Sequence, residues 1–274
     1  METINAIQTY LGPQWQPYFL ALTHLGSEAA YIVLLSLYYW LIDPRQGQRL
    51  GVVLSLSYGG NVLLKQLFAL PRPYQLDSSV ASDVAQSTAG GFAFPSGHAQ
   101  GSATFWGVLA LHYRRLWLWL LGLGVMGLVA LSRVYLGVHF GRDVIAGLAL
   151  GLTFAWLGQR LSVSLPTTRL FPTLMVLGGL GLTIAIPELA RPLGVLMGLS
   201  LASAQFTPPK TWPRRLLVGV LGLVASFALL FLLKQITLWL AAPPWSDYGR
   251  YGLLALFIAE AWPRLWRLGS DAHS

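Results

Sequence analysis

The sequence predicts an all-α fold, a polytopic bundle of about nine transmembrane helices with its amino terminus outside and its carboxyl terminus in the cytoplasm. Of the 274 residues, 55% are hydrophobic and only 10% are charged, whereas about a quarter of the residues of a soluble domain are charged. Eleven Trp and eleven Tyr residues suit the aromatic belts that anchor helices at both membrane interfaces. We therefore interpret the chain as an integral membrane protein surrounded by membrane lipids.

Residues 1–26 precede the first predicted span and favour one or two short helices that lie in the membrane interface. Pro13 and Pro17 interrupt this stretch, which mixes apolar residues with Gln, Asn, Thr and His. The first residues lack the basic region and the short apolar core of a cleavable signal. Ser27 can cap the helix that follows, and residues 29–42 can cross a membrane if their flanks contribute to the roughly 20 residues that a span needs.

A polar turn over residues 43–49 leads to the second span, residues 50–68, and a long polar segment follows over residues 69–95. Loops of this length in compact proteins are usually functional. Seven further apolar runs complete the predicted bundle, over residues 97–113, 116–131, 143–157, 170–186, 193–206, 216–240 and 251–262. Lys234 lies well inside the eighth run, where we expect it to snorkel or to pair with Glu260.

Alternation of nine spans places most of the basic loop residues on one side, which the positive-inside rule assigns to the cytoplasm. These residues are Arg45, Arg49, Arg114, Arg115, Arg160, Arg169, Lys210, Arg214, Arg215, Arg264 and Arg267. Because this rule accounts for the net charge of +8 and no long basic run occurs, we predict no nucleic-acid partner. We divide the chain into a core, residues 1–160, which includes the interfacial amino-terminal segment, and additional helices of unknown role, residues 161–274.

Three segments with unusual polar residues are predicted to meet at the outer face. In the first, Lys65 sits one turn before the end of the second span and Arg72 follows a proline that has ended it. The second is Pro-Ser-Gly-His, where Ser96, Gly97 and His98 stand at the amino end of the third span. Exposed N–H groups at a helix start make an anion site, and glycine lets the anion approach closely. Taken separately, these segments also fit a snorkelling lysine and a plain helix cap.

The third segment, residues 131–143, joins the fourth and fifth spans and carries Arg133, His139 and Asp143. His139 and Asp143 are four residues apart, so they share one helix face if the fifth helix begins near the histidine. A carboxylate so placed fixes the tautomer of the ring and leaves its other nitrogen as a nucleophile or base. A salt-bridged helix start would explain Asp143 and Arg142 but neither His139 nor Arg133.

Together the three segments supply three cations, neutral donors and two histidines, an inventory that matches a phosphoryl group. Lys65, Arg72 and Arg133 are the cations. We predict no metal, because carboxylates are scarce here and the two histidines lack a third ligand. The absence of Cys removes thiolate ligands and cysteine nucleophiles as well.

The three segments in this order resemble the signature of the type 2 phosphatidic acid phosphatase superfamily: Lys-x6-Arg-Pro, Pro-Ser-Gly-His and Ser-Arg-x5-His-x3-Asp. They stand here as Lys65 to Pro73, Pro95 to His98 and Ser132 to Asp143. The resemblance implies a metal-independent and cofactor-free phosphatase in which His139 attacks phosphorus, Asp143 orients it and His98 protonates the leaving oxygen. It also implies phosphate binding by Lys65, Arg72, Ser96, Gly97 and Arg133.

Nine spans with an outer amino terminus are similar to the topology of glucose-6-phosphatase and the sphingosine-phosphate phosphatases. We expect hydrolysis of a lipid phosphate or a prenyl diphosphate, because an amphiphilic substrate can leave its chain in the lipid while its head enters a cationic site. A soluble sugar phosphate is the alternative substrate, and a non-catalytic phosphate-binding transporter is the alternative function. The compact chain favours a bacterial inner (plasma) membrane with the active site on the outer side. The sequence predicts no oligomeric state.

Overall fold

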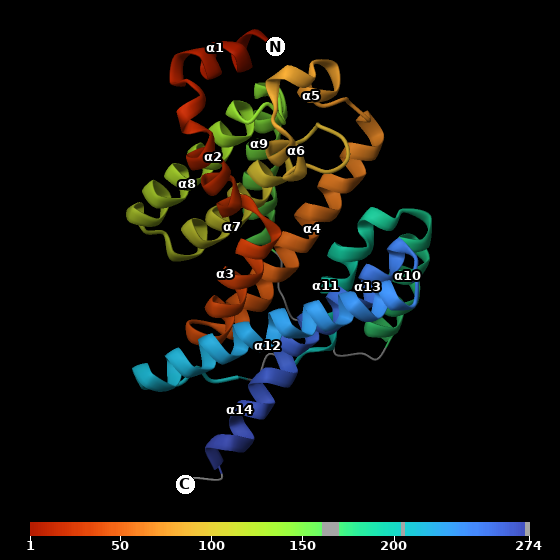
Figure 1. Ribbon diagram of the computed structural model, residues 1–274. Helices are drawn as coiled ribbons and strands as arrows, with labels where there is room; N and C mark the ends of the chain where they lie inside the picture. Colours follow the sequence, from red (N-terminus) through yellow and green to blue (C-terminus); the bar gives the residue numbers. More distant parts are fainter. Residues whose placement is uncertain (161–169, 204–205, 272–274) are drawn as a thin grey trace. The chain divides into compact units, whose positions relative to one another are not determined.

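The computed structural model describes residues 1–160, 170–203 and 206–271, and every regular element in these ranges is a helix, as predicted (Figure 1). The α-helices are α1 Glu2–Leu11, α2 Gln16–Thr23, α3 Glu28–Leu41, α4 Pro44–Phe68, α5 Pro73–Leu76, α6 Asp83–Ser87, α7 Gly97–Tyr113, α8 Leu116–Tyr135, α9 Gly141–Gly158, α10 Leu170–Ala185, α11 Ala190–Leu201, α12 Trp212–Trp239, α13 Asp247–Leu256 and α14 Trp262–Asp271. Short 3-10 turns join several of them, among them η2 (His24–Gly26) and η3 (Ser78–Val80).

The chain forms two compact units that do not follow a single cut in the sequence. The first unit comprises Met1–Tyr31 and Leu56–Leu161, and the second comprises Ile32–Ser55 and Ser162–Ser274. Helices α3 and α4 therefore each contribute one part to the first unit and the other part to the second. The second unit thus combines Ile32–Ser55 with the residues from Ser162 onward.

In the first unit, α7 and α9 approach each other closely along a pair of glycines on α9. A Cβ atom at Gly147 would lie 2.6 Å from the Ser96 carbonyl oxygen, and one at Gly151 would meet the carbonyl of Gln100. This close packing brings the first turn of α9 against the start of α7, where Ser96 N donates a hydrogen bond to the Asp143 carbonyl at 2.9 Å. Two of the three sequence segments are thereby held side by side.

A buried polar network fixes α4 against α7. Asn61 Nδ2 donates to Gln100 Oε1 at 2.8 Å and to the Pro95 carbonyl at 3.3 Å. Gln100 Nε2 in turn donates to the Ser57 carbonyl at 2.7 Å, and the Ser57 and Thr104 hydroxyls lie 2.8 Å apart. Buried polar groups that are mutually satisfied specify one arrangement of the helices. The network therefore sets the register that brings Lys65, one turn after Asn61, to the start of α7.

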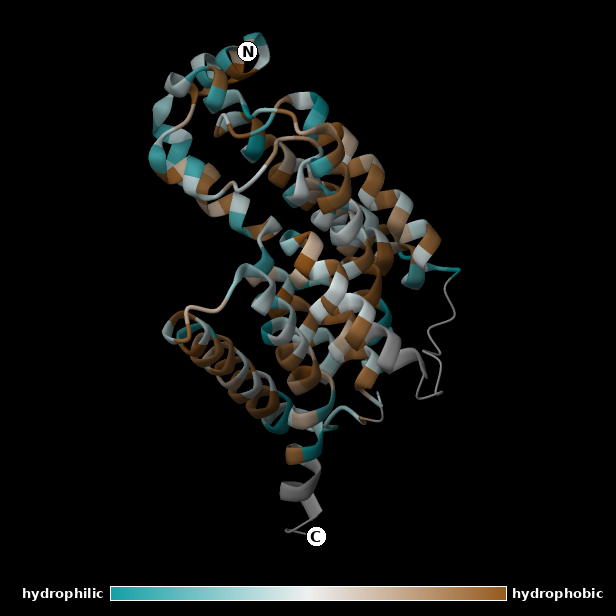
Figure 2. Ribbon diagram, turned by 90° about the vertical axis from the view of Figure 1, so that its right-hand side faces the viewer, coloured by the Kyte–Doolittle hydropathy of each residue, from teal (hydrophilic) through white to brown (hydrophobic). Residues whose placement is uncertain are grey.

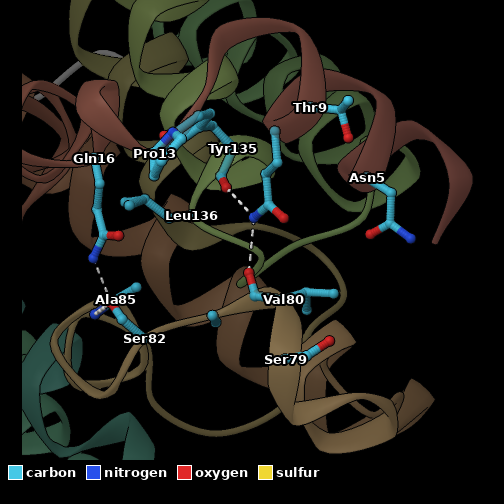
Figure 3. A pocket seen from close by; sticks show the side chains of 12 residues that line it. Asn5, Thr9, Pro13, Gln16, Ser79, Val80, Ser82, Ala85, Tyr135 and Leu136 are labelled. Carbon is cyan, nitrogen blue, oxygen red and sulfur yellow. Dashed lines mark hydrogen bonds between the residues drawn. The ribbon is translucent and has the colours of Figure 1, made fainter.

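The amino-terminal helices pack on the end of α8. The rings of Phe19 and Tyr135 stack with centroids 4.2 Å apart, and Tyr135 Oη donates to the Gly12 carbonyl at 2.7 Å. Gln8 Nε2 donates to the carbonyls of Val80 and Tyr135 at 2.8 and 2.7 Å (Figure 3). An open pocket of about 650 Å³ lies beside these bonds and is lined by residues of α1, η3 and the end of α8. None of the predicted site residues lines it.

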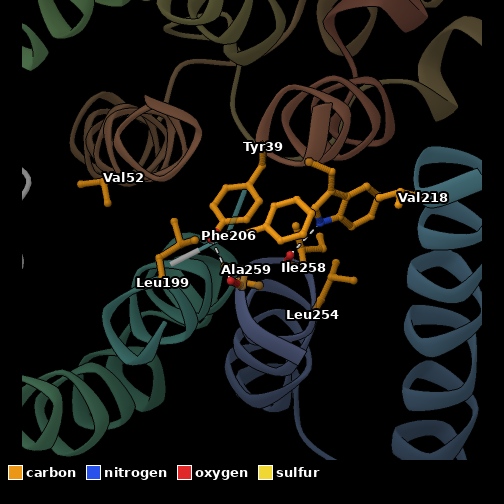
Figure 4. Close-up of a cluster of buried hydrophobic side chains, with 10 residues drawn as sticks. Tyr39, Val52, Leu199, Phe206, Val218, Leu254, Ile258 and Ala259 are labelled. Atoms are coloured by element: carbon orange, nitrogen blue, oxygen red, sulfur yellow. Dashed lines mark hydrogen bonds between the residues drawn. The ribbon is translucent and has the colours of Figure 1, made fainter. Parts of the chain in front are cut away.

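The second unit has its own hydrophobic core, shown in Figure 4. Trp40 is fully buried and its Nε1 donates to the Ile258 carbonyl at 2.8 Å, while Tyr39 Oη donates to the Ala259 carbonyl at the same distance. The other buried members are Val52, Leu199, Phe206, Val218, Leu254, Ala255, Ile258 and Ala259. Residues of α3 and α4 are thus anchored to the carboxyl-terminal helices by packing and by satisfied hydrogen bonds.

Snorkelling and pairing with Glu260 are the two alternatives for Lys234, and the carboxylate of Glu260 binds other groups. Its Oε2 accepts hydrogen bonds from the backbone N and the hydroxyl of Ser203 at 2.7 and 2.8 Å, and its other oxygen pairs with Arg264. These partners satisfy the carboxylate. Lys234 is exposed on α12, in agreement with the snorkelling alternative.

Three helical segments of the described chain are long and apolar enough to cross a membrane: Pro44–Leu76, Leu116–Tyr135 and Trp212–Trp239. A fourth arises if the bent pair Pro13–Gly26 and Glu28–Leu41 counts as one span. The count of nine and the orientation of the termini are not confirmed. One reason is length, because α11 has 12 residues and at 1.5 Å per residue is about 18 Å long, short of a hydrocarbon core of about 30 Å. Figure 2 shows hydrophobic residues along the longer helices and a more hydrophilic amino-terminal end.

Candidate active site

The three sequence segments come together in the first unit, around buried charged side chains. Arg72 and His139 are each 2% exposed, and Arg133 and Asp143 are fully buried. Charges are almost never removed from water unless they are paired or hydrogen-bonded, so this cluster carries a specific arrangement of partners.

His139 lies in the loop between α8 and α9, two residues before α9 begins at Gly141. His139 thus lies just outside α9 and does not share a helix face with Asp143, yet the two side chains do meet. The loop turns at Gly137, whose φ of +67° is unfavourable for other residues. A Cβ at Gly137 would also collide with the Val80 carbonyl. His139 N donates to the Arg133 carbonyl at 3.3 Å, which ties the loop back to the end of α8.

Arg72, His139 and Asp143 form a line of contacts through the imidazole ring. Arg72 Nη1 lies 3.1 Å from His139 Nε2, and His139 Nδ1 lies 3.5 Å from Asp143 Oδ2. A guanidinium has no acceptor, so Nε2 accepts the bond and the proton of a neutral ring sits on Nδ1, facing the carboxylate. The second contact is long for a hydrogen bond, as catalytic contacts often are in ligand-free enzymes. Asp143 Oδ2 is held in place by the N–H of Phe140 at 2.9 Å.

Burial lowers the pKa of the His139 imidazole well below its ordinary value of 6.5, and the charges of Arg72, Arg133 and Lys65 lower this pKa further. The ring is therefore neutral at pH 7. A neutral ring with its proton on Nδ1 has its lone pair on Nε2, which is the state that a nucleophile or base requires.

The remaining donors of Arg72 bind backbone carbonyls. Nε donates to Gly91 at 2.8 Å, Nη2 donates to Gly90 and Phe92 at 2.6 and 3.1 Å, and Nη1 donates to Val138 at 2.9 Å. Together with His139, these partners engage all five N–H groups of the guanidinium. Lys65 Nζ donates to the same Phe92 carbonyl, so the two cations are neighbours.

Residues 88–92 are not among the residues that the sequence predicts for the site. Their signal is a Gly-Gly pair in a polar loop, immediately before Pro-Ser-Gly-His. Gly91 adopts a φ of +64°, which supports the choice of glycine there. This segment supplies carbonyl acceptors to the two cations that the sequence predicted for a phosphate.

Arg133, in the last turn of α8, is held by two threonines. Its Nη1 donates to the hydroxyls of Thr23 and Thr88 at 2.7 and 2.9 Å, and its Nη2 donates to the Thr88 carbonyl at 3.2 Å. Its Nε is buried and has no hydrogen-bond partner. An unpaired buried donor costs about 1–3 kcal/mol, so this N–H is suited to an anionic ligand.

Ser96 stands at the N-cap of α7, but its side chain makes no capping hydrogen bond. Its Oγ is buried and has no hydrogen-bond partner in the structure. The plain serine cap that the sequence allowed is therefore not formed, and the hydroxyl stands beside the first N–H groups of the helix. Gly97 and His98 are half-buried in the first turn of α7, so the start of this helix presents donors for an anion.

Residues 47–164 match the sequence profile of the PAP2 superfamily. The matched segment, called the PAP2 domain below, spans less than half of the chain and makes the chain similar to this superfamily. All eight predicted site residues fall inside this domain, which confirms the resemblance drawn from the three motifs. Helices α1 and α2, and with them Thr23, lie before it.

Relatives of the PAP2 domain are phosphatases. This chain is 29% identical to the undecaprenyl-diphosphatase of Sulfolobus acidocaldarius over 153 residues. The match covers 54% of this chain and 71% of that protein. The chain is 31% identical over 163 residues, 55% of its length, to a probable sphingosine-1-phosphate phosphatase of Dictyostelium discoideum, of which it spans only 39%. Phosphatidylglycerophosphatase B of Bacillus subtilis is 37% identical over 75 residues, 24% of this chain and 37% of that protein. These matches confirm the predicted enzyme class, a phosphate hydrolase of the PAP2 type.

The crystal structure of Aquifex aeolicus LpxE has the same fold, with a TM-score of 0.50 and 24% sequence identity. The likeness covers 58% of this chain and 94% of LpxE. In the described part of the chain, no group of three or more His, Asp or Glu side chains is placed to hold a metal ion. Metal independence stays a prediction.

Proposed function

We propose that this chain is an integral membrane phosphatase that hydrolyses a lipid phosphate or a prenyl diphosphate through a phosphohistidine intermediate, without a metal. The observation that carries the proposal is the buried line from Arg72 through His139 to Asp143, with contacts of 3.1 and 3.5 Å. A passive anion site needs cations but no histidine held in one tautomer against a carboxylate. This argument favours an enzyme over a transporter.

In the proposed reaction, His139 Nε2 attacks phosphorus while the bond from phosphorus to the leaving oxygen breaks. His98 gives its proton to that oxygen, so the leaving group departs protonated, as an alcohol or as a shortened phosphate. Water then attacks the phosphohistidine, gives a proton to His98, and releases inorganic phosphate with Nε2 restored. Covalent catalysis of this kind divides one difficult displacement into two easier ones. Arg72 must first release Nε2, because its N–H occupies the same lone pair.

Phosphate oxygens are proposed to bind Lys65, Arg72 and Arg133 together with Ser96 and the N–H of Gly97. The buried Ser96 Oγ and Arg133 Nε, which have no protein partner, support this role. Donors arranged in advance around developing charge are usually the largest catalytic term. Since the cations supply this charge, the proposed chemistry does not call for a metal.

An amphiphilic substrate is supported by the surface of α8, the helix that carries Arg133. Seven large apolar side chains of α8 are exposed: Leu116, Trp117, Leu120, Leu121, Leu123, Leu128 and Leu131. A contiguous apolar surface of this kind marks contact with lipid. We propose that the substrate tail stays in the lipid beside such helices, in a bacterial inner membrane with the site on its outer side. The names of the relatives, which include a diphosphatase of undecaprenyl and phosphatases of sphingosine-1-phosphate, support a lipid-linked phosphate.

Phosphate release by purified protein in detergent tests the proposal, with phosphatidic acid, a prenyl diphosphate and glucose 6-phosphate as substrates. We expect release from at least one of the two lipids, and an acid-labile phosphoenzyme after rapid quenching that His139→Gln abolishes. His112→Gln is the matched control, because His112 lies at the opposite end of α7.

Release from glucose 6-phosphate alone would favour the soluble-substrate alternative. If His139→Gln and Arg133→Ala release phosphate as fast as the wild type from every substrate, the proposed function is wrong.

A further inference from the structure

Arg133 is the one proposed phosphate-binding cation whose guanidinium is hydrogen-bonded to a residue outside the PAP2 domain, among the contacts of the described chain. Of its donors, Nη1 binds the Thr23 hydroxyl at 2.7 Å, the shortest of its three contacts. Thr23 precedes the domain, which begins at residue 47. Both side chains are fully buried, so this bond is made without competition from water.

Packing contacts of the residues before and after Thr23 in the sequence fix its position. Thr23 is the last residue of α2 and is followed by η2, which packs between α7 and α8. A Cβ at Gly26 in this turn would lie 2.8 Å from Val129 Cγ1 and 3.1 Å from His98 Cβ, so the turn is in direct contact with both helices. Four residues before Thr23, Phe19 stacks on Tyr135. The position of the Thr23 hydroxyl is therefore determined by close packing.

The bond sets the orientation of the guanidinium plane. Thr23 and Thr88 take both hydrogens of Nη1, and the Thr88 carbonyl takes one hydrogen of Nη2. What remains is Nε–H, which is buried without a partner, and one hydrogen of Nη2. Those two donors lie along the same edge of the planar fork, the edge that binds two oxygens of a phosphate.

We infer that Thr23 is a positioning residue, through which the amino-terminal helices orient Arg133 for the phosphoryl group. The inference rests on the proposed function. Thr88 belongs to the loop that also carries three of the acceptors of Arg72, whereas Thr23 sits on a packed helix. Thr23 is thus the more firmly packed member of the pair, and through it α2 contributes a residue to the proposed active site.

The inference predicts a loss of phosphate affinity when only the Thr23 hydroxyl is removed. Thr23→Val should raise the inhibition constant of orthovanadate and lower kcat/KM by about tenfold, since bonds between a neutral and a charged group are the stronger kind. Thr23→Ser keeps the hydroxyl and should restore most of the affinity. Thr183→Val is the matched control, because Thr183 is equally buried but lies on α10 in the second unit.

A double-mutant cycle separates positioning from a merely structural role. With Arg133→Ala in place, Thr23→Val should cause no further loss of vanadate affinity, because the group that Thr23 orients is gone. An additive loss in the double variant would overturn the inference. So would vanadate inhibition and kcat/KM in Thr23→Val that equal those of the wild type.

The same variants also separate failure of this inference from failure of the proposed function. If Thr23→Val does not fold, Thr23→Ala takes its place in the same cycle, because it removes the hydroxyl without adding a branch that must fit. If the wild type is active and Arg133→Ala is not, while the Thr23 variants match the wild type, the inference fails and the proposed function stands. If the wild type and Arg133→Ala are equally inactive on all substrates, the proposed function itself fails.

Discussion

Arg72 Nη1 lies 3.1 Å from Nε2 of His139, and this contact determines which ring nitrogen carries the proton. Because a guanidinium only donates, the neutral imidazole is protonated at Nδ1, toward Asp143. The same contact also covers the lone pair that would attack phosphorus. In the proposed mechanism, Arg72 therefore holds the ring in the tautomer that attacks phosphorus, and it must move away from Nε2, or share its hydrogen with a phosphate oxygen, before the ring can react.

Replacing the ring should abolish turnover. We expect His139→Gln to lower kcat by about 10³-fold or more, as losses of a covalent nucleophile do. Asp143→Asn should lower kcat with little change in KM, because it alters the orientation and charge behind the ring but no group that binds the substrate. Initial rates of phosphate release measure both. A normal kcat for His139→Gln would mean that another residue forms the covalent bond.

We expect that a lysine cannot substitute functionally for Arg72. Arg72→Lys keeps the positive charge but has three donors instead of five and lacks the planar fork. We expect kcat/KM to fall by about 10- to 100-fold, from loss of bidentate binding. The exposed Arg115, at the start of α8, provides the control Arg115→Lys, which should leave kcat/KM unchanged. Equal activity of both variants would show that only charge is needed at position 72.

The neutral, buried His139 should make the protein less stable in mild acid. Its folded-state pKa is lowered below the ordinary value of 6.5, so the unfolded chain binds a proton below this pH that the folded protein does not bind. Stability is then full above pH 6.5 and falls as the pH falls, by up to about 1.4 kcal/mol per pH unit for one proton. Thermal unfolding in detergent at a series of pH values should show a shallower fall for His139→Gln. Parallel curves for the two proteins would contradict this expectation.

Two glycines provide a matched pair for testing the loop before His139. Gly137→Ala forces a side chain into a φ of +67° and against the Val80 carbonyl, so we expect a loss of about 1–3 kcal/mol of stability. At Gly127, inside α8, a Cβ would meet nothing within 4 Å, and Gly127→Ala should stabilise by about 0.5–1 kcal/mol. Unfolding temperatures measure both changes. Equal stability of the two variants would mean that the turn relaxes.

The sequence predicts the helical class, the polar loop and the residues of the three segments, because each depends on local composition or on spacing along the chain. The line from Arg72 to Asp143 brings together residues that the motifs name. What local patterns do not reveal is how distant backbones meet. The carbonyls of Gly90 and Gly91 lie opposite Arg72, and Thr23 lies opposite Arg133, and neither pairing follows from spacing along the chain.

The number of membrane spans is also difficult to predict from local sequence patterns. Apolar runs such as residues 193–206 and 251–262 predict crossings, yet the helices that form there are shorter or interrupted by a π-helical turn at Phe257–Ala261. Their apolar side chains pack within the second unit, as the contacts of Leu199 and Ile258 illustrate. Hydropathy measures the preference of a segment for an apolar environment but does not distinguish lipid from a protein core.

The hydrogen bonds from Tyr39 to Ala259 and from Trp40 to Ile258 bear on how this enzyme can be shortened. A deletion after Gly158 would keep the three motifs of the PAP2 domain but would leave an indole N–H, a phenol and two large rings of α3 with no counterpart. The cost of exposing them would fall on α3, and α3 and α4 also continue into the first unit, which holds the candidate active site. The carboxyl-terminal half is thus no detachable module, and a minimal catalytic fragment needs a redesigned α3 surface rather than a simple stop codon.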